Sequence, residues 1–315
     1  MIAKIAVIGT GAWGKNHARV FHEIKNAELV AVCDIDEEKA KRIAKMYNCK
    51  WYTDYRDLLR NENIDAVSIA TPTTTHFEVA KYAIERGFHV LVEKPLAATV
   101  EEGIKLVDLA KDNSVLLMVG FITRFCVGVQ KLKELIKKKE IGDPVLLNAR
   151  RVGPFWPERV GDVGVVKDVA IHDIDSFRYL LDKDPIAVYA TAGSLKHRYD
   201  DHTDIILHFD GDLNGFIEAN WLTPNKKREI SVTGSQAIVS VDLLTQDIIM
   251  ETEEWIMKSK TSWVEPLKLE LQHFAESVAK KRVPIVTGED GVKALLIAEK
   301  VLESAKTRKP VDIVF

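Results

Sequence analysis

The sequence has few cysteines, little net charge and no long apolar run, and each shortage excludes a class of protein. Its three cysteines (Cys33, Cys49 and Cys126) are widely spaced and odd in number, so they form neither a disulfide framework nor a C-x-x-C site. The formal net charge of −3 at pH 7 gives no reason to expect nucleic acid or an anionic membrane as a partner. No apolar run approaches the roughly 20 residues that span a bilayer.

The sequence also lacks a basic leader or a cleavable apolar region before its first strand pattern, so we expect a cytoplasmic protein. What is present is typical of a globular protein. Hydrophobic residues make up 46% of the 315 positions and charged residues 29%. A chain of this length and composition is expected to form two domains with full cores.

The N-terminal segment carries a dinucleotide-binding pattern. The apolar strand Ile5-Ala6-Val7-Ile8 runs directly into Gly9-Thr10-Gly11-Ala12-Trp13-Gly14, and a helical pattern follows. In such a turn the glycines permit the tight bend, the approach of a pyrophosphate and close helix–strand packing. A second strand, residues 29–33, ends at Asp34, which lies twenty residues past Gly14. A carboxylate there accepts hydrogen bonds from a ribose 2′-hydroxyl and repels a 2′-phosphate, so NAD is favoured over NADP.

The order of elements predicts two domains with a boundary near residue 121. Strands and helices alternate up to that point, which is typical of a doubly wound parallel sheet. Beyond it, short β-type runs joined by tight turns predict a mostly antiparallel sheet with helices. The fold class is therefore α/β, with a Rossmann domain over residues 1–121 and an α+β domain over residues 122–315. Expected helices cover 37–47, 55–60, 77–86, 100–111, 130–139, 268–280 and 290–306; expected strands cover 51–52, 66–70, 89–92, 115–119, 145–151, 186–192, 203–209, 213–221, 229–233, 238–241 and 247–250.

Two segments at strand ends of the first domain can carry chemistry. Ala70-Thr71-Pro72 and the residues up to His76 follow a buried strand, where open α/β sheets bind ligands. The same residues also suit a helix N-cap, and the two interpretations are compatible. Glu93-Lys94-Pro95 ends the next strand, where a lysine can stabilise a developing alkoxide. The alternative is a solvated lysine. Pro95 could follow a cis bond.

The segment Asp168-Val169-Ala170-Ile171-His172-Asp173 has the spacing of a proton-transfer pair. If it is helical, Asp168 and His172 share one face, with Asp175 near the same stripe. An acid that orients an imidazole suits proton transfer near neutral pH. Alone, the pattern also fits an ordinary helix with a polar face.

Together these motifs resemble the glucose-fructose oxidoreductase / inositol dehydrogenase / MocA family. The resemblance rests on the glycine turn, Glu93-Lys94-Pro95, Gly120-Phe121 with Arg124-Phe125, and Asp168-x-x-x-His172-Asp173. It implies a Rossmann domain followed by an open-faced sheet domain that mediates oligomerisation, here as a homodimer or homotetramer. It also implies catalysis by Lys94, Asp168 and His172. The sequence departs from the family pattern at two places that bear on the substrate pocket. Ile122 stands where the family carries Asn, and the glycine stretch is thinned to Gly161-Asp162-Val163-Gly164.

From this resemblance the expected cofactor contacts extend beyond the glycine turn and Asp34. They are Ala70, Thr71, Pro72, His76, Glu93, Lys94 and Arg124. The expected substrate contacts are Lys94, Asp168 and His172, with Arg151, Trp156 and Arg159 from a Gly/Pro-rich loop upstream of Asp168. Arginine forks suit phosphate oxygens and aromatic faces suit a base or sugar ring, although the loop could equally be a rigid surface loop.

Three segments resemble the branch of the family that oxidises C3 of UDP-N-acetylglucosamine-type sugars. They are this loop, Asp162-Val163-Gly164-Val165 and residues 218–224. We therefore expect NAD-dependent oxidation of a secondary ring hydroxyl, without a metal. A dehydrogenase of a free sugar or polyol, an NAD-dependent glycosidase and a non-catalytic NAD-sensing regulator remain alternatives. The ligand-rich stretch from His197 to Asp204 is expected to be a solvated turn rather than a metal site.

Overall fold

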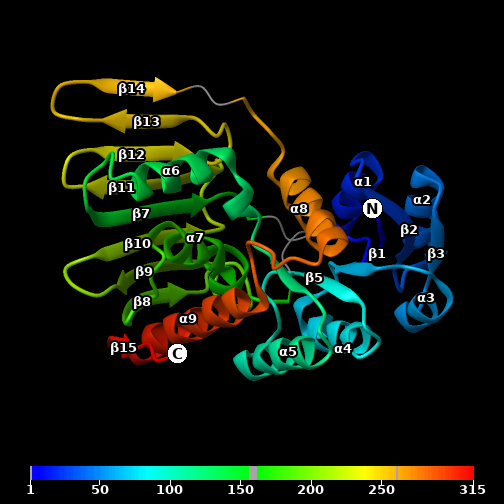
Figure 1. Cartoon of the computed structure of the whole chain (residues 1–315). Helices are drawn as coiled ribbons and strands as arrows, with labels where there is room; N and C mark the ends of the chain where they lie inside the picture. Colours follow the sequence, from blue (N-terminus) through cyan, green and yellow to red (C-terminus); the bar gives the residue numbers. More distant parts are fainter. Residues whose placement is uncertain (1, 156–161, 260–261) are drawn as a thin grey trace. The chain divides into compact units, whose positions relative to one another are not determined.

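The computed structural model describes residues 2–155, 162–259 and 262–315, and it divides the chain into two compact units (Figure 1). Unit 1 consists of Met1–Phe121 and Leu267–Val292, and unit 2 consists of Ile122–Pro266 and Lys293–Phe315. The first boundary coincides with the expected one at residue 121. The expectation of a second domain that runs unbroken from 122 to 315 needs correction, because Leu267–Val292 belongs with the Rossmann core.

Unit 1 is built on a six-stranded parallel sheet in the order β3-β2-β1-β4-β5-β6. Its strands are β1 (Ala3–Ile8), β2 (Ala27–Cys33), β3 (Lys50–Tyr52), β4 (Ala66–Ile69), β5 (His89–Glu93) and β6 (Leu117–Gly120). Its helices are α1 (Gly14–Glu23), α2 (Glu37–Tyr47), α3 (Tyr55–Asn61), α4 (Thr73–Ile84), α5 (Val100–Asp112) and α8 (Pro266–Lys280). Because β1 lies between β2 and β4, the strand order reverses beside it. The carboxyl ends of β1 and β4 are therefore the expected ligand-binding edge of the sheet.

Local sequence signals explain three of the helix starts described in unit 1. Asp36, Asp54 and Thr99 precede α2, α3 and α5, and each side chain accepts a hydrogen bond from a backbone N–H of the first turn. Helix α4 differs from expectation, since it begins at Thr73 rather than at residue 77. Pro72 holds its N-cap position and gives no side-chain hydrogen bond to the helix.

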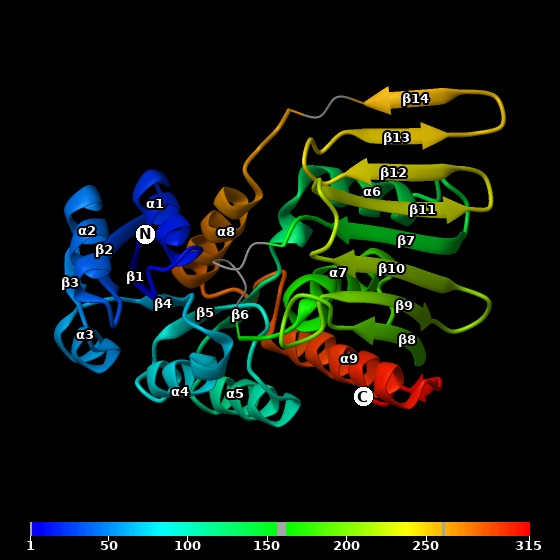
Figure 2. The same ribbon diagram turned by 180° about the vertical axis from the view of Figure 1, so that it is seen from behind.

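Unit 2 is built on a nine-stranded sheet in the order β14-β13-β12-β11-β7-β10-β9-β8-β15 (Figure 2). Only β7 and β10 pair in parallel, and the other neighbours are antiparallel, as the sequence predicts. The strands are β7 (Pro144–Val152), β8 (Ala187–Gly193), β9 (His202–His208), β10 (Asn214–Asn220), β11 (Lys227–Gly234), β12 (Ile238–Asp242), β13 (Ile248–Glu251), β14 (Ile256–Ser259) and β15 (Val311–Asp312).

One face of this sheet is covered by helices and carries the core of unit 2. The helical elements are η1 (Ile122–Phe125), α6 (Val127–Lys137), a π-helical turn η3 (Val166–Ala170), α7 (Ile171–Leu181) and the part of α9 (Gly288–Thr307) that follows Val292. Phe177 of α7 packs on Gly215 of β10, where a Cβ would lie 2.6 Å from the ring. Strands β14 and β15 are absent from the expectation because β14 is exposed along its whole length and β15 has two residues, so neither shows a burial pattern.

The other face of the unit 2 sheet is open among the described elements, and it holds a shallow hollow of about 420 Å³. The register places Tyr189, Ile206 and Phe216 side by side across β8, β9 and β10 on this face. Each of these three side chains is close to 40% exposed. None of the described helices is long and apolar enough to cross a membrane.

Candidate active site

The glycine turn of unit 1 has a conformation that needs its glycines. Gly9 has φ 89°, and a Cβ there would lie 2.6 Å from the carbonyl oxygen of Ala70. A Cβ on Gly14 would overlap the carbonyl oxygen of Gly9 at 1.8 Å. A Cβ on Gly11 would meet no atom of the described residues within 4 Å, so this position is open toward them. The first and third glycines therefore close the turn, and Gly11 leaves room for a ligand to approach the backbone.

Asp34 lies beside this turn at the end of β2. Its Oδ2 accepts hydrogen bonds from the backbone N–H of Thr10 at 2.7 Å and from Oγ1 of Thr10 at 2.9 Å. Its Oδ1 accepts from the N–H of Asp36 at 3.0 Å. These contacts hold the carboxylate at the strand end. The N-terminus of α1 has no acidic residue in its first turn and no side-chain cap, so its N–H groups suit a phosphate.

A buried polar cluster lies around Glu93, at the end of β5. Glu93 Oε1 accepts hydrogen bonds from Trp13 Nε1 at 2.5 Å and lies 2.9 Å from His17 Nε2; His17 Nδ1 lies 2.8 Å from Ser68 Oγ. The backbone N–H of Lys94 donates to Oε2 at 3.2 Å. Burial pushes the pKa of Glu93 up, but these hydrogen bonds and the nearby positive charge outweigh it and lower the pKa. Glu93 therefore remains a carboxylate and orients the backbone that carries Lys94.

A second carboxyl group belongs to this cluster, and sequence reasoning missed it. Glu270 of α8 is fully buried, and neither of its carboxyl oxygens has a hydrogen-bond partner among the described residues. Burial first, and then the negative charge of Glu93, raise the pKa of Glu270 well above its ordinary value. Glu270 is therefore the protonated member of the pair. A lone Glu on a helix with ordinary amphipathic spacing gave no signal of this role.

The expected cofactor residue His76 links two loops of unit 1. It is buried, with Nδ1 2.9 Å from the carbonyl oxygen of Pro95 and Nε2 2.9 Å from that of Thr71. The Lys94–Pro95 peptide bond is cis. His76 thus connects the end of β4 to the loop that carries Lys94.

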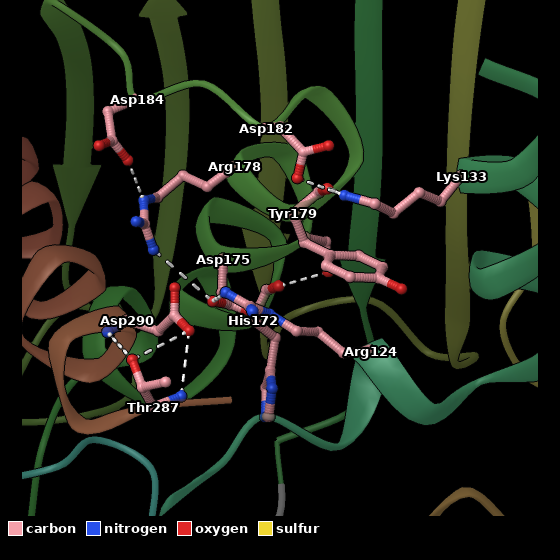
Figure 3. Close-up of polar contacts among 11 residues, drawn as sticks. Arg124, Lys133, His172, Asp175, Arg178, Tyr179, Asp182, Asp184, Thr287 and Asp290 are labelled. Atoms are coloured by element: carbon pink, nitrogen blue, oxygen red, sulfur yellow. Dashed lines mark hydrogen bonds and ion pairs between the residues drawn. The ribbon is translucent and has the colours of Figure 1, made fainter. Parts of the chain in front are cut away.

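In unit 2 the acid and the imidazole lie at a helix junction. Asp168 lies inside the π-helical turn η3. His172 lies in the first turn of α7, where Figure 3 shows its side chain. The segment is helical through both residues, but the helix changes from π to α between them. Oδ2 of Asp200 accepts the N–H of Val166 at 2.7 Å and holds the start of the turn.

Two arginines that the sequence predicts at ligands form buried ion pairs in the structure. Arg124 binds Asp175 through two hydrogen bonds, Nε at 2.8 Å and Nη2 at 2.6 Å (Figure 3). Arg151 binds Asp173 in the same way, at 2.9 Å and 2.7 Å. Both arginines are at most 6% exposed. Their forks are occupied within unit 2, so the geometry gives no support to cofactor binding by Arg124 or substrate binding by Arg151.

Aromatic side chains gather at the end of the sheet where β7 and β10 finish. The rings of Phe155 and His197 are 6.1 Å apart, and those of His197 and Trp221 are 5.6 Å apart. Tyr199 lies 5.4 Å from the same imidazole. Of the loop expected to bind substrate, Trp156 and Arg159 lie outside the described residues.

The turn before β9 exposes the side chains of Arg198 and Tyr199 but also contains a buried acid. Asp201 is fully buried, and its Oδ2 accepts backbone N–H groups of Leu195 at 2.8 Å and His197 at 3.1 Å, as well as that of Lys196. Burial raises the pKa of Asp201, but these hydrogen bonds outweigh it and lower the pKa. Asp201 therefore organises the turn.

Comparisons with known proteins cover both units of the chain. Residues 3–121 match the family model "Oxidoreductase family, NAD-binding Rossmann fold", and residues 129–240 match the GFO/IDH/MocA C-terminal domain. A scyllo-inositol 2-dehydrogenase (NAD(+)) from Bacillus subtilis is 30% identical over 98% of this chain and 96% of its own length. The chain belongs to the Gfo/Idh/MocA oxidoreductase family. It is an oxidoreductase, and its N-terminal domain is an NAD-binding Rossmann domain.

Other relatives in this family point to a different substrate. A UDP-N-acetylglucosamine 3-dehydrogenase from Acidithiobacillus ferrooxidans is 35% identical over 59% of this chain and 57% of its own length. A solved structure of the UDP-N-acetylglucosamine 3-dehydrogenase GnnA from that organism matches with a TM-score of 0.89 at 27% identity, over 98% of this chain and 99% of its own. The comparisons therefore include both a polyol dehydrogenase and a nucleotide-sugar dehydrogenase.

Proposed function

We propose that this protein is an NAD-dependent dehydrogenase that oxidises a secondary ring hydroxyl of a sugar, at C3 of a UDP-N-acetylglucosamine-type nucleotide sugar. NAD fits the residues of unit 1, because Gly11 leaves open space at the turn and Asp34 presents a carboxylate at the end of β2. When bound, NAD supplies the acceptor for a hydride. The residues of the glycine turn and the ends of β2 and β4 would hold it.

The chain's own residues handle the proton and the developing charge. His172 accepts the proton of the substrate hydroxyl, and Asp168 orients the imidazole. Lys94 stabilises the alkoxide as negative charge develops on the oxygen. Glu93 helps to hold Lys94 in place, because the backbone N–H of Lys94 donates a hydrogen bond to the Glu93 carboxylate.

The aromatic cluster of Phe155, His197, Tyr199 and Trp221 carries the nucleotide-sugar assignment. It lies at the sheet end where β7 and β10 finish, and β10 packs against the turn that carries Asp168. A surface of this kind suits stacking on a base or a sugar ring, and a free cyclitol would use little of it. Similarity to the UDP-N-acetylglucosamine 3-dehydrogenase supports the same substrate class.

The test is reduction of NAD by the purified protein with UDP-N-acetylglucosamine, myo-inositol and glucose, after a check for cofactor that remains bound. We expect reduction with the nucleotide sugar and not with the free polyols. Activity only on the free polyols would replace the nucleotide-sugar assignment by the inositol-type one. Release of sugar from a glycoside without net NADH would favour an NAD-dependent glycosidase, and bound NAD with no reaction at all would favour a regulator.

The roles of individual residues are tested by His172→Asn and Lys94→Ala. Each is expected to lower turnover by about 10²–10⁴-fold, with NAD affinity little changed. His208→Asn is the matched control. His208 lies at the end of β9 away from the aromatic cluster, where it contacts Asn214. Turnover equal to that of the parent protein in either test variant would remove that residue from the mechanism.

We also propose that a second copy of the chain covers the open face of the unit 2 sheet, giving a homodimer or a homotetramer. Tyr189, Ile206 and Phe216 form a continuous row on that face, and the ion pair Arg150–Glu218 lies on the neighbouring row. A two-fold axis would bring this row against itself. Light scattering of Phe216→Glu should then give a lower mass than the parent, while Met46→Glu on α2 should not. A monomeric parent protein would contradict the proposal.

A further inference from the structure

Arg228 of β11 lies next to a buried ion pair on the helix-covered face of the unit 2 sheet. In the antiparallel register of β11 and β7, Arg228 is the direct partner of Arg151. Paired residues of neighbouring strands project to the same face of a sheet. Arg151 reaches Asp173 of α7 on that face, so Arg228 projects toward the helices as well. On the other side of β7, Ala219 of β10 completes the row, and β10 packs against the turn that holds Asp168.

The two arginines differ in how their charges are compensated. Arg151 donates twice to Asp173 and once more to Oγ1 of Thr123 at 3.4 Å. Arg228 makes no side-chain hydrogen bond or ion pair with any residue in the described ranges, and it is only partly exposed. Burial, followed by the charge of Arg151, lowers the pKa of Arg228 to about 10, although Asp173 and Asp168 act in the opposite direction. The guanidinium is thus still charged at neutral pH.

A guanidinium in this state is costly unless an acceptor meets it. Arginine carries five N–H donors in a planar fork, and removing them from water without partners is unfavourable. The cation of a phosphate- or carboxylate-binding site has this character, because the ligand supplies both the charge and the acceptors. Nearby Lys227 does not serve the same purpose, since it projects to the other face and pairs with Glu229 at 3.0 Å.

The location connects Arg228 to the proposed substrate site. Lys227 is paired with Val152, and Asn220 is paired with Val152 from the other side, so β11 begins at the sheet end where β7 and β10 finish. The aromatic cluster described above lies at this same end. A charged fork, an aromatic surface and the turn of Asp168 therefore share one region of unit 2.

We propose that Arg228 binds an anionic group attached to the sugar that is oxidised, and so selects charged over uncharged substrates. This inference rests on the proposed dehydrogenase function. It assigns to Arg228 the role that the sequence suggested for Arg151. The ligand chemistry is phosphate in a nucleotide sugar, and the same fork would bind the carboxylate of a sugar acid.

The experiment compares two pairs of ligands on the NAD-saturated protein. They are UDP-N-acetylglucosamine against N-acetylglucosamine, and glucuronate against glucose, with dissociation constants from calorimetry and KM values where turnover occurs. We expect the parent protein to prefer the charged member of at least one pair. Arg228→Met should weaken binding of that charged member by about tenfold or more and leave binding of its uncharged counterpart unchanged. Arg228→Lys should lose less, because it keeps the charge but not the fork.

Lys258→Met on β14 is the control, since it removes one exposed cation from the same sheet far from β7. Circular dichroism establishes that each variant is folded, and the lysine variant provides the comparison if the methionine variant is not. An equal loss for charged and uncharged ligands, no loss at all, or a parent protein that prefers the uncharged member of both pairs would overturn the proposal. Dependence on Arg228 for glucuronate alone would support it while refuting the nucleotide-sugar assignment.

Discussion

Glu270→Gln should make this protein more stable, and the gain should grow with pH. Glu270 is fully buried without a hydrogen-bond partner among the described residues, and burial and the negative charge of Glu93 raise its pKa. The native state therefore keeps its proton well above the ordinary pKa of 4.5, whereas the unfolded chain releases it there. Since the native state binds the extra proton, each rise in pH above that value favours the unfolded state.

The size of the effect follows from the single proton involved. Between the ordinary pKa and the raised native pKa, the free energy of unfolding of the parent falls by about 1.4 kcal/mol per pH unit because of Glu270. A glutamine has nearly the same shape and cannot ionise, so this contribution to the slope disappears in the variant. The difference in stability between variant and parent should therefore grow by about 1.4 kcal/mol for each unit of pH in this window. The additional N–H of the amide also changes the free energy of unfolding of the variant, by about 1 kcal/mol at every pH.

Urea denaturation followed by circular dichroism at several pH values between about 5.5 and 7.5 measures this directly. The relevant transition is the one that unfolds unit 1. Glu276→Gln on the same helix is the control, because Glu276 is partly exposed and pairs with Arg282 at 2.9 Å. Its difference from the parent should stay constant with pH. Parallel curves for Glu270→Gln and the parent would show that Glu270 does not hold a proton in the native state, and the reasoning would fail.

Two further predictions concern charges at the ends of strands and in the core. Asp34→Ala should raise the affinity for NADP relative to NAD by about tenfold, because the carboxylate that repels a 2′-phosphate is lost. Cofactor titration measures this ratio, and an unchanged ratio would remove Asp34 from cofactor selection. Asp175→Asn should destabilise the protein by about 3–5 kcal/mol in urea denaturation, because Arg124 would stay buried without its counter-charge; a loss below about 1 kcal/mol would mean that Arg124 reaches another acceptor.

The fold could be predicted largely from the sequence because its signals are local. Strand β1 is apolar and buried from Ile5 to Ile8 and is followed at once by the glycine turn. The helices α2, α3 and α5 begin at capping side chains. The elements that were missed lack such signals. Strand β14 is exposed on both faces, and α8 was predicted as a helix but not as a part of unit 1.

The partners of charged side chains could not be predicted, because they depend on contacts between distant segments. Arg124 and its partner Asp175 are 51 residues apart, and Arg151 and Asp173 are 22 residues apart. In the sequence these arginines are indistinguishable from ligand-binding ones. Arg228 gave no signal, since its place opposite Arg151 follows only from the register of β11 on β7. The register of the sheet determines which arginine has no carboxylate partner among the described residues.

The turn that holds Asp168 explains the glycine at position 164. Only a thinned glycine stretch, Gly161-Asp162-Val163-Gly164, precedes Asp168. Gly164 is the glycine of this stretch that lies nearest to Asp168 in the sequence. A Cβ at Gly164 would lie 2.0 Å from Oδ1 of Asp200, whose other carboxyl oxygen accepts the N–H of Val166. The carbonyl oxygen of Gly164 in turn accepts the N–H of Asp168 at 2.9 Å. Any side chain at residue 164 would displace the carboxylate that holds the π-helical turn, so this glycine is required for the position of Asp168.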